Sequence, residues 1–79
     1  MTQHHIVFYT KPGCHLCEDA LALLNRLRDE FTMTIQTIDI TNDDALFKKY
    51  FDKIPVLWID ERTTLAAPID EKNLRAALM

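Results

Sequence analysis

The sequence has 79 residues, of which 48% are hydrophobic and 27% are charged. This balance is typical of a folded globular protein, and the length suits a single domain, which we place at residues 1–79. The formal net charge is −3 and no run of lysine or arginine stands out, which argues against nucleic-acid binding. No apolar run approaches the roughly 20 residues that span a bilayer, and the first residues lack the basic start of a signal peptide. We therefore expect a cytoplasmic protein with no membrane partner.

The first predicted strand leads directly into a pair of cysteines. Ile6–Tyr9 is a continuous apolar run, typical of a strand inside a sheet, and Pro12–Gly13 ends it. A helix is predicted from Cys14 to about Glu30 because apolar residues recur along one helical face. On this helix Cys14 falls in the exposed first turn, whereas Cys17 falls on the side that faces the core.

The middle of the chain predicts a strand, a short helix and a third strand. In the strand predicted over Met33–Ile40, Met33 and Ile35 would point to one face of the sheet and Ile38 and Ile40 to the other. This change of face indicates either a bulge or a strand whose far end is covered on both faces. A short helix is predicted over Asp43–Phe51, in which Leu46, Phe47, Tyr50 and Phe51 mostly fill the core, with one aromatic at the rim of the site as the alternative. The next strand is predicted over Val56–Ile59. His4 and His5, before the first strand, are expected to be solvated.

The last part of the chain predicts a hairpin and a terminal helix. A tight turn leads into a fourth strand over Thr63–Ala67, and Asp70 is the predicted N-cap of the final helix. The element order is therefore β-α-β-α-β-β-α. Only the first helix is long enough to join parallel strands, so one right-handed βαβ crossover is expected.

The position of the two cysteines predicts thiol chemistry. A free cysteine thiol has a pKa near 8.5, and the unpaired N–H groups at a helix start lower it to about 3.5–7.5. Cys14 occupies this position, and Lys11 and a protonated His15 would add positive charge nearby. Glu18 would oppose the thiolate, but we expect the helix start and Lys11 to outweigh this solvent-screened charge.

The C-x-x-C spacing supplies a second thiol for the same reaction. On a first helical turn, Cys17 is one turn from Cys14, close enough for their sulfurs to meet. Cys14 is therefore predicted to attack a substrate disulfide, and Cys17 to attack the Cys14 sulfur and release the reduced substrate.

The segment Tyr9–Cys17, with the later Lys53–Leu57, resembles the glutaredoxin-like branch of the thioredoxin fold, in particular small bacterial glutaredoxin-like proteins. The resemblance covers nearly the whole chain. It implies an α/β, thioredoxin-like domain of the glutaredoxin type, with a four-stranded mixed sheet and helices on both faces. The implied strand order is second, first, third, fourth, with the third strand antiparallel to the first two.

The resemblance also implies a substrate site around the dithiol. It predicts a cis peptide bond at Ile54–Pro55, with the Ile54 backbone pairing to an extended substrate as an added strand. Lys11 is carried over as a thiolate-stabilising residue and a carboxylate contact. The predicted catalytic residues are thus Cys14 and Cys17. The predicted substrate-binding residues are Lys11, His15, Ile54 and Pro55.

Two departures from the family pattern argue against a glutathione site. Glutathione-using glutaredoxins usually carry Thr-Val-Pro at the cis-proline, where this chain has Lys53–Ile54–Pro55. They also carry a Gly-Gly pair after the following strands, where this chain has Ala66–Ala67–Pro68. No resident cofactor or metal is expected, and glutathione is retained only as an alternative co-substrate.

These observations predict a thiol–disulfide oxidoreductase, expected to be monomeric. Its partners would be a disulfide-containing protein or a small thiol, with a reductase or glutathione as electron donor. Two other functions stay open. The cysteines could hold a metal or an iron–sulfur cluster shared between two chains, because two cysteines alone are too few ligands. Alternatively, the domain could be a non-catalytic adaptor that keeps the fold for partner docking.

Overall fold

Strands and helices follow one another in the predicted order. The structure is a computed structural model that describes residues 3–79. Its elements are β1 (His4–Thr10), α1 (His15–Leu27), β2 (Met33–Asp39), the 3-10 turn η1 (Ile40–Asn42), α2 (Asp44–Tyr50), β3 (Val56–Ile59), β4 (Thr63–Ala66) and α3 (Glu71–Leu78). Within the described residues, no helix is both long and apolar enough to cross a membrane.

The four strands form one mixed sheet in the order β2-β1-β3-β4. β1 runs parallel to β2, whereas β3 is antiparallel to both β1 and β4. The predicted strand order and directions are therefore confirmed. The parallel pair is joined by α1, the only connection long enough for a crossover.

The pairing of β2 with β1 bears on the two explanations offered for the change of face among its apolar residues, a bulge or a covered far end. Its pairing with β1 runs without interruption from His4↔Met33 to Thr10↔Asp39, so no bulge interrupts it. The strand ends at Asp39, one residue earlier than predicted, and Ile40 is fully buried in η1. The buried Ile40 therefore lies beyond the strand, and inside it Ile38 is half-buried and Thr37 exposed, so the far end of β2 is only partly covered.

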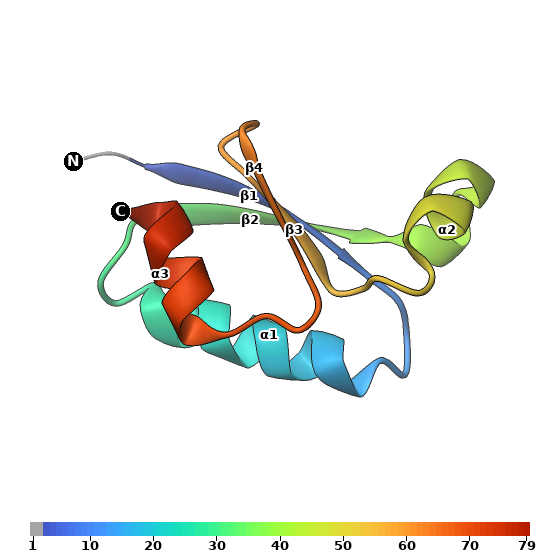
Figure 1. The fold of residues 1–79 in the computed structure, drawn as a ribbon, viewed down its shortest axis with the longest axis horizontal. Helices are drawn as coiled ribbons and strands as arrows, with labels where there is room; N and C mark the ends of the chain where they lie inside the picture. The colour runs from blue at the N-terminus through green and yellow to red at the C-terminus, as the bar shows by residue number, and fades with distance from the viewer. Residues whose placement is uncertain (1–2) are drawn as a thin grey trace.

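Two helices cover one face of the sheet and the third lies at its end. Figure 1 shows α1 and α3 together on the same side, with α2 beyond the end of β2. The core between the sheet and the helices α1 and α3 is made of aliphatic and aromatic side chains: Ile6, Phe8, Leu24, Leu27, Leu57, Ile59, Leu74 and Leu78. Burying each such side chain stabilises the fold by about 1.5–3 kcal/mol, so this layer is the main source of stability.

α2 reaches the opposite face of the sheet through one aromatic contact. Side chains alternate along a strand, so Tyr9 points away from the face that holds Phe8. The ring of Tyr50 on α2 lies 4.8 Å from the ring of Tyr9, centroid to centroid. Helices therefore lie on both faces, as predicted, although α2 covers only one end of its face.

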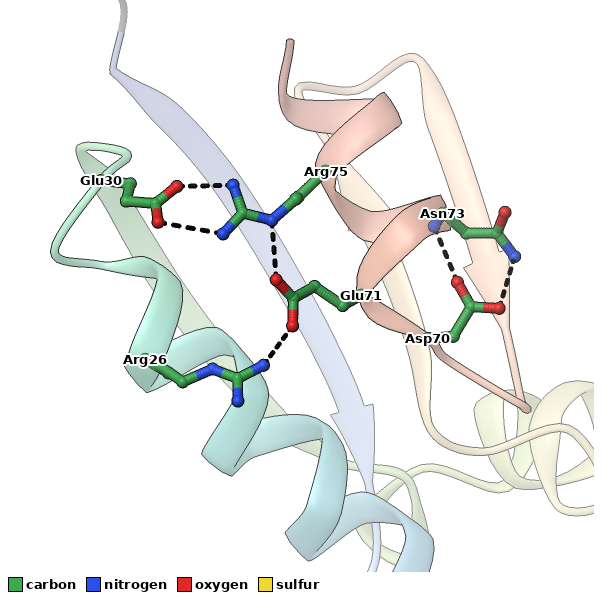
Figure 2. Close-up of polar contacts among 6 residues, drawn as sticks. All are labelled: Arg26, Glu30, Asp70, Glu71, Asn73 and Arg75. Carbon is green, nitrogen blue, oxygen red and sulfur yellow. Dashed lines mark hydrogen bonds and ion pairs between the residues drawn. The ribbon is translucent and has the colours of Figure 1, made fainter.

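Helix starts are fixed by side chains that accept backbone N–H groups. Asp70 Oδ1 accepts the N–H of Asn73 at 2.7 Å (Figure 2), which confirms Asp70 as the predicted N-cap of α3. Asp43 Oδ1 accepts the N–H of Leu46 at 3.1 Å at the start of α2. α1 ends at Leu27, earlier than the predicted end near Glu30, because the chain turns there toward β2.

A network of four charged side chains joins α1 and the turn after it to α3 (Figure 2). Arg75 donates two hydrogen bonds to Glu30 at 2.5 and 2.9 Å and a third to Glu71 at 2.8 Å, and Arg26 also contacts Glu71. The hydrogen bond from Arg75 holds the pKa of Glu30 below its usual range. Each of these side chains is at least about one third exposed, so the network orients α3 on α1 more than it stabilises the fold.

A histidine–aspartate pair fastens the β3–β4 turn to β1. His4 Nδ1 lies 2.6 Å from Asp60 Oδ2, and Asp60 Oδ1 accepts the N–H of His5 at 2.8 Å. Asp60 and Glu61 have φ values of 55° and 57°, a region that favours glycine, and these contacts hold the turn in it. The expectation that His4 is solvated is wrong, because its side chain is buried against this turn.

Candidate dithiol site

The two cysteines are joined at the start of α1. Cys14 and Cys17 form a disulfide with their Cα atoms 5.2 Å apart, inside the usual range for a bridged pair. The loop that delivers them turns at Gly13, whose φ of +75° is readily adopted only by glycine. The Pro12–Gly13 break read from the sequence thus serves to turn the chain from β1 into α1.

Cys14 is the N-cap of α1. Its backbone is extended, with φ −92° and ψ 105°, and its Sγ accepts the N–H of Cys17 at 3.2 Å. Cys14 is partly exposed, whereas Cys17 is only 3% exposed and belongs to the core. The structure therefore places the two sulfurs in different surroundings, one facing solvent at the helix start and the other behind it.

The charges near Cys14 partly cancel one another. His15 Nδ1 lies 3.6 Å from Glu18 Oε2, and both side chains are largely exposed. A protonated His15 would thus offset the negative charge of Glu18, the one residue expected to oppose a thiolate. Lys11 is exposed in the loop before Cys14. The groups that would still stabilise a thiolate at Cys14 are Lys11 and the free N–H groups of the first helical turn.

The Ile54–Pro55 peptide bond is cis, as the resemblance implied. The register brings this bond to the same end of the sheet as the cysteines. Tyr9 pairs with Val56 at the end of the β1–β3 ladder, so the loop to Cys14 and the segment before Val56 leave the sheet side by side. A second cis bond, Ala67–Pro68, was not predicted.

The backbone of Ile54 is only partly free to pair with a substrate. Its N–H donates to the Tyr50 carbonyl at 3.1 Å, and the N–H of Lys53 donates to the same oxygen at 2.8 Å. Among the backbone groups of residues 3–79, none donates to the Ile54 carbonyl. The pairing expected from the resemblance is therefore limited to that carbonyl in this conformation, because the N–H already has a partner.

Comparison with known proteins decides the family. The sequence profile of the Glutaredoxin-like domain (DUF836) matches residues 5–79. This chain belongs to that family. A relative from Dictyostelium discoideum, named glutaredoxin-like protein YDR286C homolog, is 36% identical over 78 residues, covering 89% of this chain and 70% of that protein. An uncharacterized protein from Mycobacterium bovis is 28% identical over 81 residues, covering 96% of this chain and 84% of that protein.

Two solved structures share the fold of this glutaredoxin-like domain. The solution structure of protein Ne2328 from Nitrosomonas europaea has a TM-score of 0.85 and 30% identity, covering 100% of this chain and 95% of that one. The X-ray structure of protein XcR50 from X. campestris has a TM-score of 0.77 and 31% identity, covering 90% and 91%. Together with the sheet topology, they establish the thioredoxin-like, glutaredoxin-type fold.

Sequence reasoning missed an exposed aromatic pair on α2 of the glutaredoxin-like domain. Phe47 and Phe51 stack with centroids 5.8 Å apart and are 41% and 53% exposed, so the expectation that they fill the core is wrong. A helix turns about 100° per residue, so they lie beside the stripe of Leu46 and Tyr50 that faces the sheet. The sequence does contain a signal for this exposure. Leu46 with Tyr50 and Phe47 with Phe51 are two i,i+4 pairs offset by one residue, and a short helix can turn only one of them toward the sheet.

Two further features of the glutaredoxin-like domain bear on possible ligands. Within residues 3–79, histidine, cysteine and acidic side chains do not gather in a group of three or more that could hold a metal ion. A surface cavity of about 400 Å³ lies at the other end of the sheet, lined by His4, Asp60, Arg62 and the last turn of α3. This cavity is separate from the dithiol.

Proposed function

We propose that this glutaredoxin-like protein is a dithiol–disulfide oxidoreductase, with Cys14 as the nucleophile and Cys17 as the resolving thiol. The observation that supports this most strongly is the placement of Cys14 at the N-cap of α1. Its Sγ accepts the Cys17 N–H, and the same contact would stabilise a thiolate once the disulfide is reduced. The partly exposed Cys14 is accessible to a substrate, whereas the buried Cys17 is positioned to react only with Cys14, in the second step.

The proposed reaction moves two electrons from the protein to the substrate, and because it begins from the Cys14 thiolate, one proton comes from Cys17 and the other from water. The Cys14 thiolate attacks one sulfur of the substrate disulfide, and the other substrate sulfur leaves as a thiolate and takes up a proton. Cys17 then loses its proton and attacks the Cys14 sulfur, which breaks the mixed disulfide. The second substrate thiolate leaves and is protonated, and the protein is left with the Cys14–Cys17 disulfide described above.

The same site suggests how a substrate is held. An extended segment would pair with the Ile54 carbonyl beside Pro55, and Lys11 would contact a carboxylate or the reacting sulfur. His15 is exposed next to the nucleophile and would contact the bound substrate. The substrate would be a disulfide-containing protein or a small disulfide, handled in a reducing compartment such as the cytoplasm. A reductase or glutathione would return the electrons, with no resident cofactor.

A stoichiometric assay tests the proposal without an assumed electron donor. Reduced protein, freed of reductant, is mixed with insulin, and the thiols that appear on the substrate are counted. Wild-type protein should release two substrate thiols per chain, and Cys14→Ser should release none. Cys17→Ser should stop at the mixed disulfide, visible by mass spectrometry as one covalent adduct. Unchanged reduction by Cys14→Ser would refute the assignment.

A further inference from the structure

The exposed pair of Phe47 and Phe51 lies on a helix that contributes little to the core. α2 has seven residues and none of them is buried. The two rings stack with an interplanar angle of 22° and a large part of each is open to solvent. Neighbouring side chains on the helix, Lys48 and Lys49, are polar and exposed, so the pair forms an isolated apolar surface on a charged helix.

The aromatic pair is physically connected to the dithiol end. Phe51 is the C-cap of α2, and the turn that follows is closed by N–H groups of Lys53 and Ile54 donating to the Tyr50 carbonyl. Phe51 and the free Ile54 carbonyl therefore belong to one closed turn. In Figure 1, α2 and the start of α1 occupy the same end of the molecule. Phe51 thus precedes Ile54 in the turn that carries the carbonyl open to a substrate.

One more large apolar side chain is exposed next to the dithiol. Leu16 lies between the two cysteines in the sequence and is 55% exposed. Large apolar side chains left open beside a reactive group are typical of a binding surface. Glutathione would gain little from them, because beyond its cysteine it offers two carboxylates, an ammonium group and amides. A polypeptide with aliphatic or aromatic residues near its cysteine would bury them.

We propose that Phe47 and Phe51 form a docking surface for the apolar residues that flank the reactive cysteine of a polypeptide substrate. This inference rests on the proposed function, since it names the substrate class of the same dithiol. It commits to a polypeptide disulfide, because the surface continues from the turn whose carbonyl is open to an added strand. The reaction balance is the one given above, with two protein thiols oxidised and one substrate disulfide reduced.

The test compares three disulfides in the stoichiometric assay. Two are synthetic peptides that differ only in having leucine and phenylalanine, or serine, beside their cysteines, and the third is glutathione disulfide. The Phe47→Ser/Phe51→Ser variant is compared with Ala45→Ser/Lys48→Ser, which places two serines at exposed positions of the same helix. Circular dichroism and the thermal midpoint confirm that both variants are folded.

The expected result is specific to one substrate. Wild-type protein should reduce the apolar peptide about tenfold faster than the polar one, the effect expected for an aromatic contact at an interface. Phe47→Ser/Phe51→Ser should remove most of this advantage and leave the rate with glutathione disulfide unchanged within about twofold. The control variant should behave as wild type with all three substrates.

Several outcomes would overturn the inference, and they differ from failure of the function itself. Equal wild-type rates with both peptides, or equal losses with all three substrates, would remove the docking role while leaving the oxidoreductase intact. A dimer seen by light scattering and abolished by Phe47→Ser/Phe51→Ser, with peptide preference unchanged, would assign the surface to a second copy of the chain. Absence of reduction of any disulfide by wild-type protein would instead refute the proposed function, and the docking role with it.

Discussion

The two ends of the sheet differ in the side chains that they expose. At the end that holds the β3–β4 turn, charged groups are paired within the chain, as in His4 with Asp60 and Arg75 with Glu30. At the end that holds the dithiol, Phe47 and Phe51 are exposed and Cys14 is partly exposed. Charged groups that already pair with one another have few hydrogen bonds or charges left to offer a binding partner. We infer that recognition belongs to the end where the chain leaves its apolar and reactive groups open.

The ends also differ in how firmly their helices are attached. α1 and α3 bury leucines such as Leu24 and Leu74 in the core and are joined by the network around Arg75. α2 buries no residue completely and packs on the rest of the fold through the partly buried Leu46 and Tyr50. Local unfolding of a helix costs little free energy when few apolar contacts are lost, so α2 should unfold locally more readily than the rest of the fold. A mobile α2 could adjust Phe47 and Phe51 to different substrates.

The largest expected effect separates the two cysteines of the reduced protein. Cys14, at the helix start, should react with iodoacetamide about 100-fold faster than Cys17 near neutral pH, because its Sγ is partly exposed and accepts a backbone N–H, whereas Cys17 is buried. Time-resolved mass spectrometry of the labelled peptides gives both rates. In denaturant the two rates should converge, which serves as the control. Equal rates in the folded protein would contradict the asymmetry on which the proposed mechanism depends.

An intermediate effect compares the caps of two helices. Asp70→Ala should lower the free energy of unfolding by about 1 kcal/mol, because the Asn73 N–H loses its acceptor on a helix that carries core leucines. Asp43→Ala removes the equivalent cap from α2. Its main effect should be faster hydrogen exchange of the α2 amides, with a smaller change in global stability. Urea unfolding and amide exchange measure the two quantities, and equal global losses would contradict a loosely attached α2.

Local sequence patterns predicted most of the fold. The apolar periodicity of residues 15–27 and the continuous run at Ile6–Tyr9 depend only on neighbours in the chain, so helix and strand could be assigned directly. Cys14 and Cys17 were placed by the same local logic, as a pair opening a helix. The cis bond at Ile54–Pro55 came from family resemblance alone, because an X-Pro bond has no local signal that makes it cis.

The features that sequence reasoning missed depend on contacts between distant parts of the chain. His4 and Asp60 are separated by 56 positions, and nothing near either residue indicates their pairing. The exposure of Phe47 follows from the position of α2 at the end of the sheet, which the helical pattern does not fix. Periodicity identifies which residues share a face of a helix, but it does not say which face the rest of the fold covers.

The smallest expected effect concerns acid stability at the paired end. The hydrogen bond from His4, followed by that from the His5 N–H, holds the pKa of Asp60 below its ordinary value of 3.8. A carboxylate with a lower pKa in the folded state contributes stability above its unfolded pKa, and this contribution is lost as the pH falls through the folded pKa. Asp60→Asn should therefore lower stability at neutral pH and flatten its decline below about pH 4. Urea midpoints measured from neutral pH downward test this.

A matched substitution distinguishes this pairing from a general loss of charge. Asp29→Asn removes an exposed carboxylate after α1, for which no hydrogen-bond partner occurs within residues 3–79, and should leave the acid decline unchanged. Because Asp60 lies at the opposite end of the sheet from Cys14, Asp60→Asn should also leave the alkylation rate of Cys14 unaltered. A change in that rate would show that the two ends communicate through β1 and β3, and the separation between an internally paired end and a reactive end would then have to be abandoned.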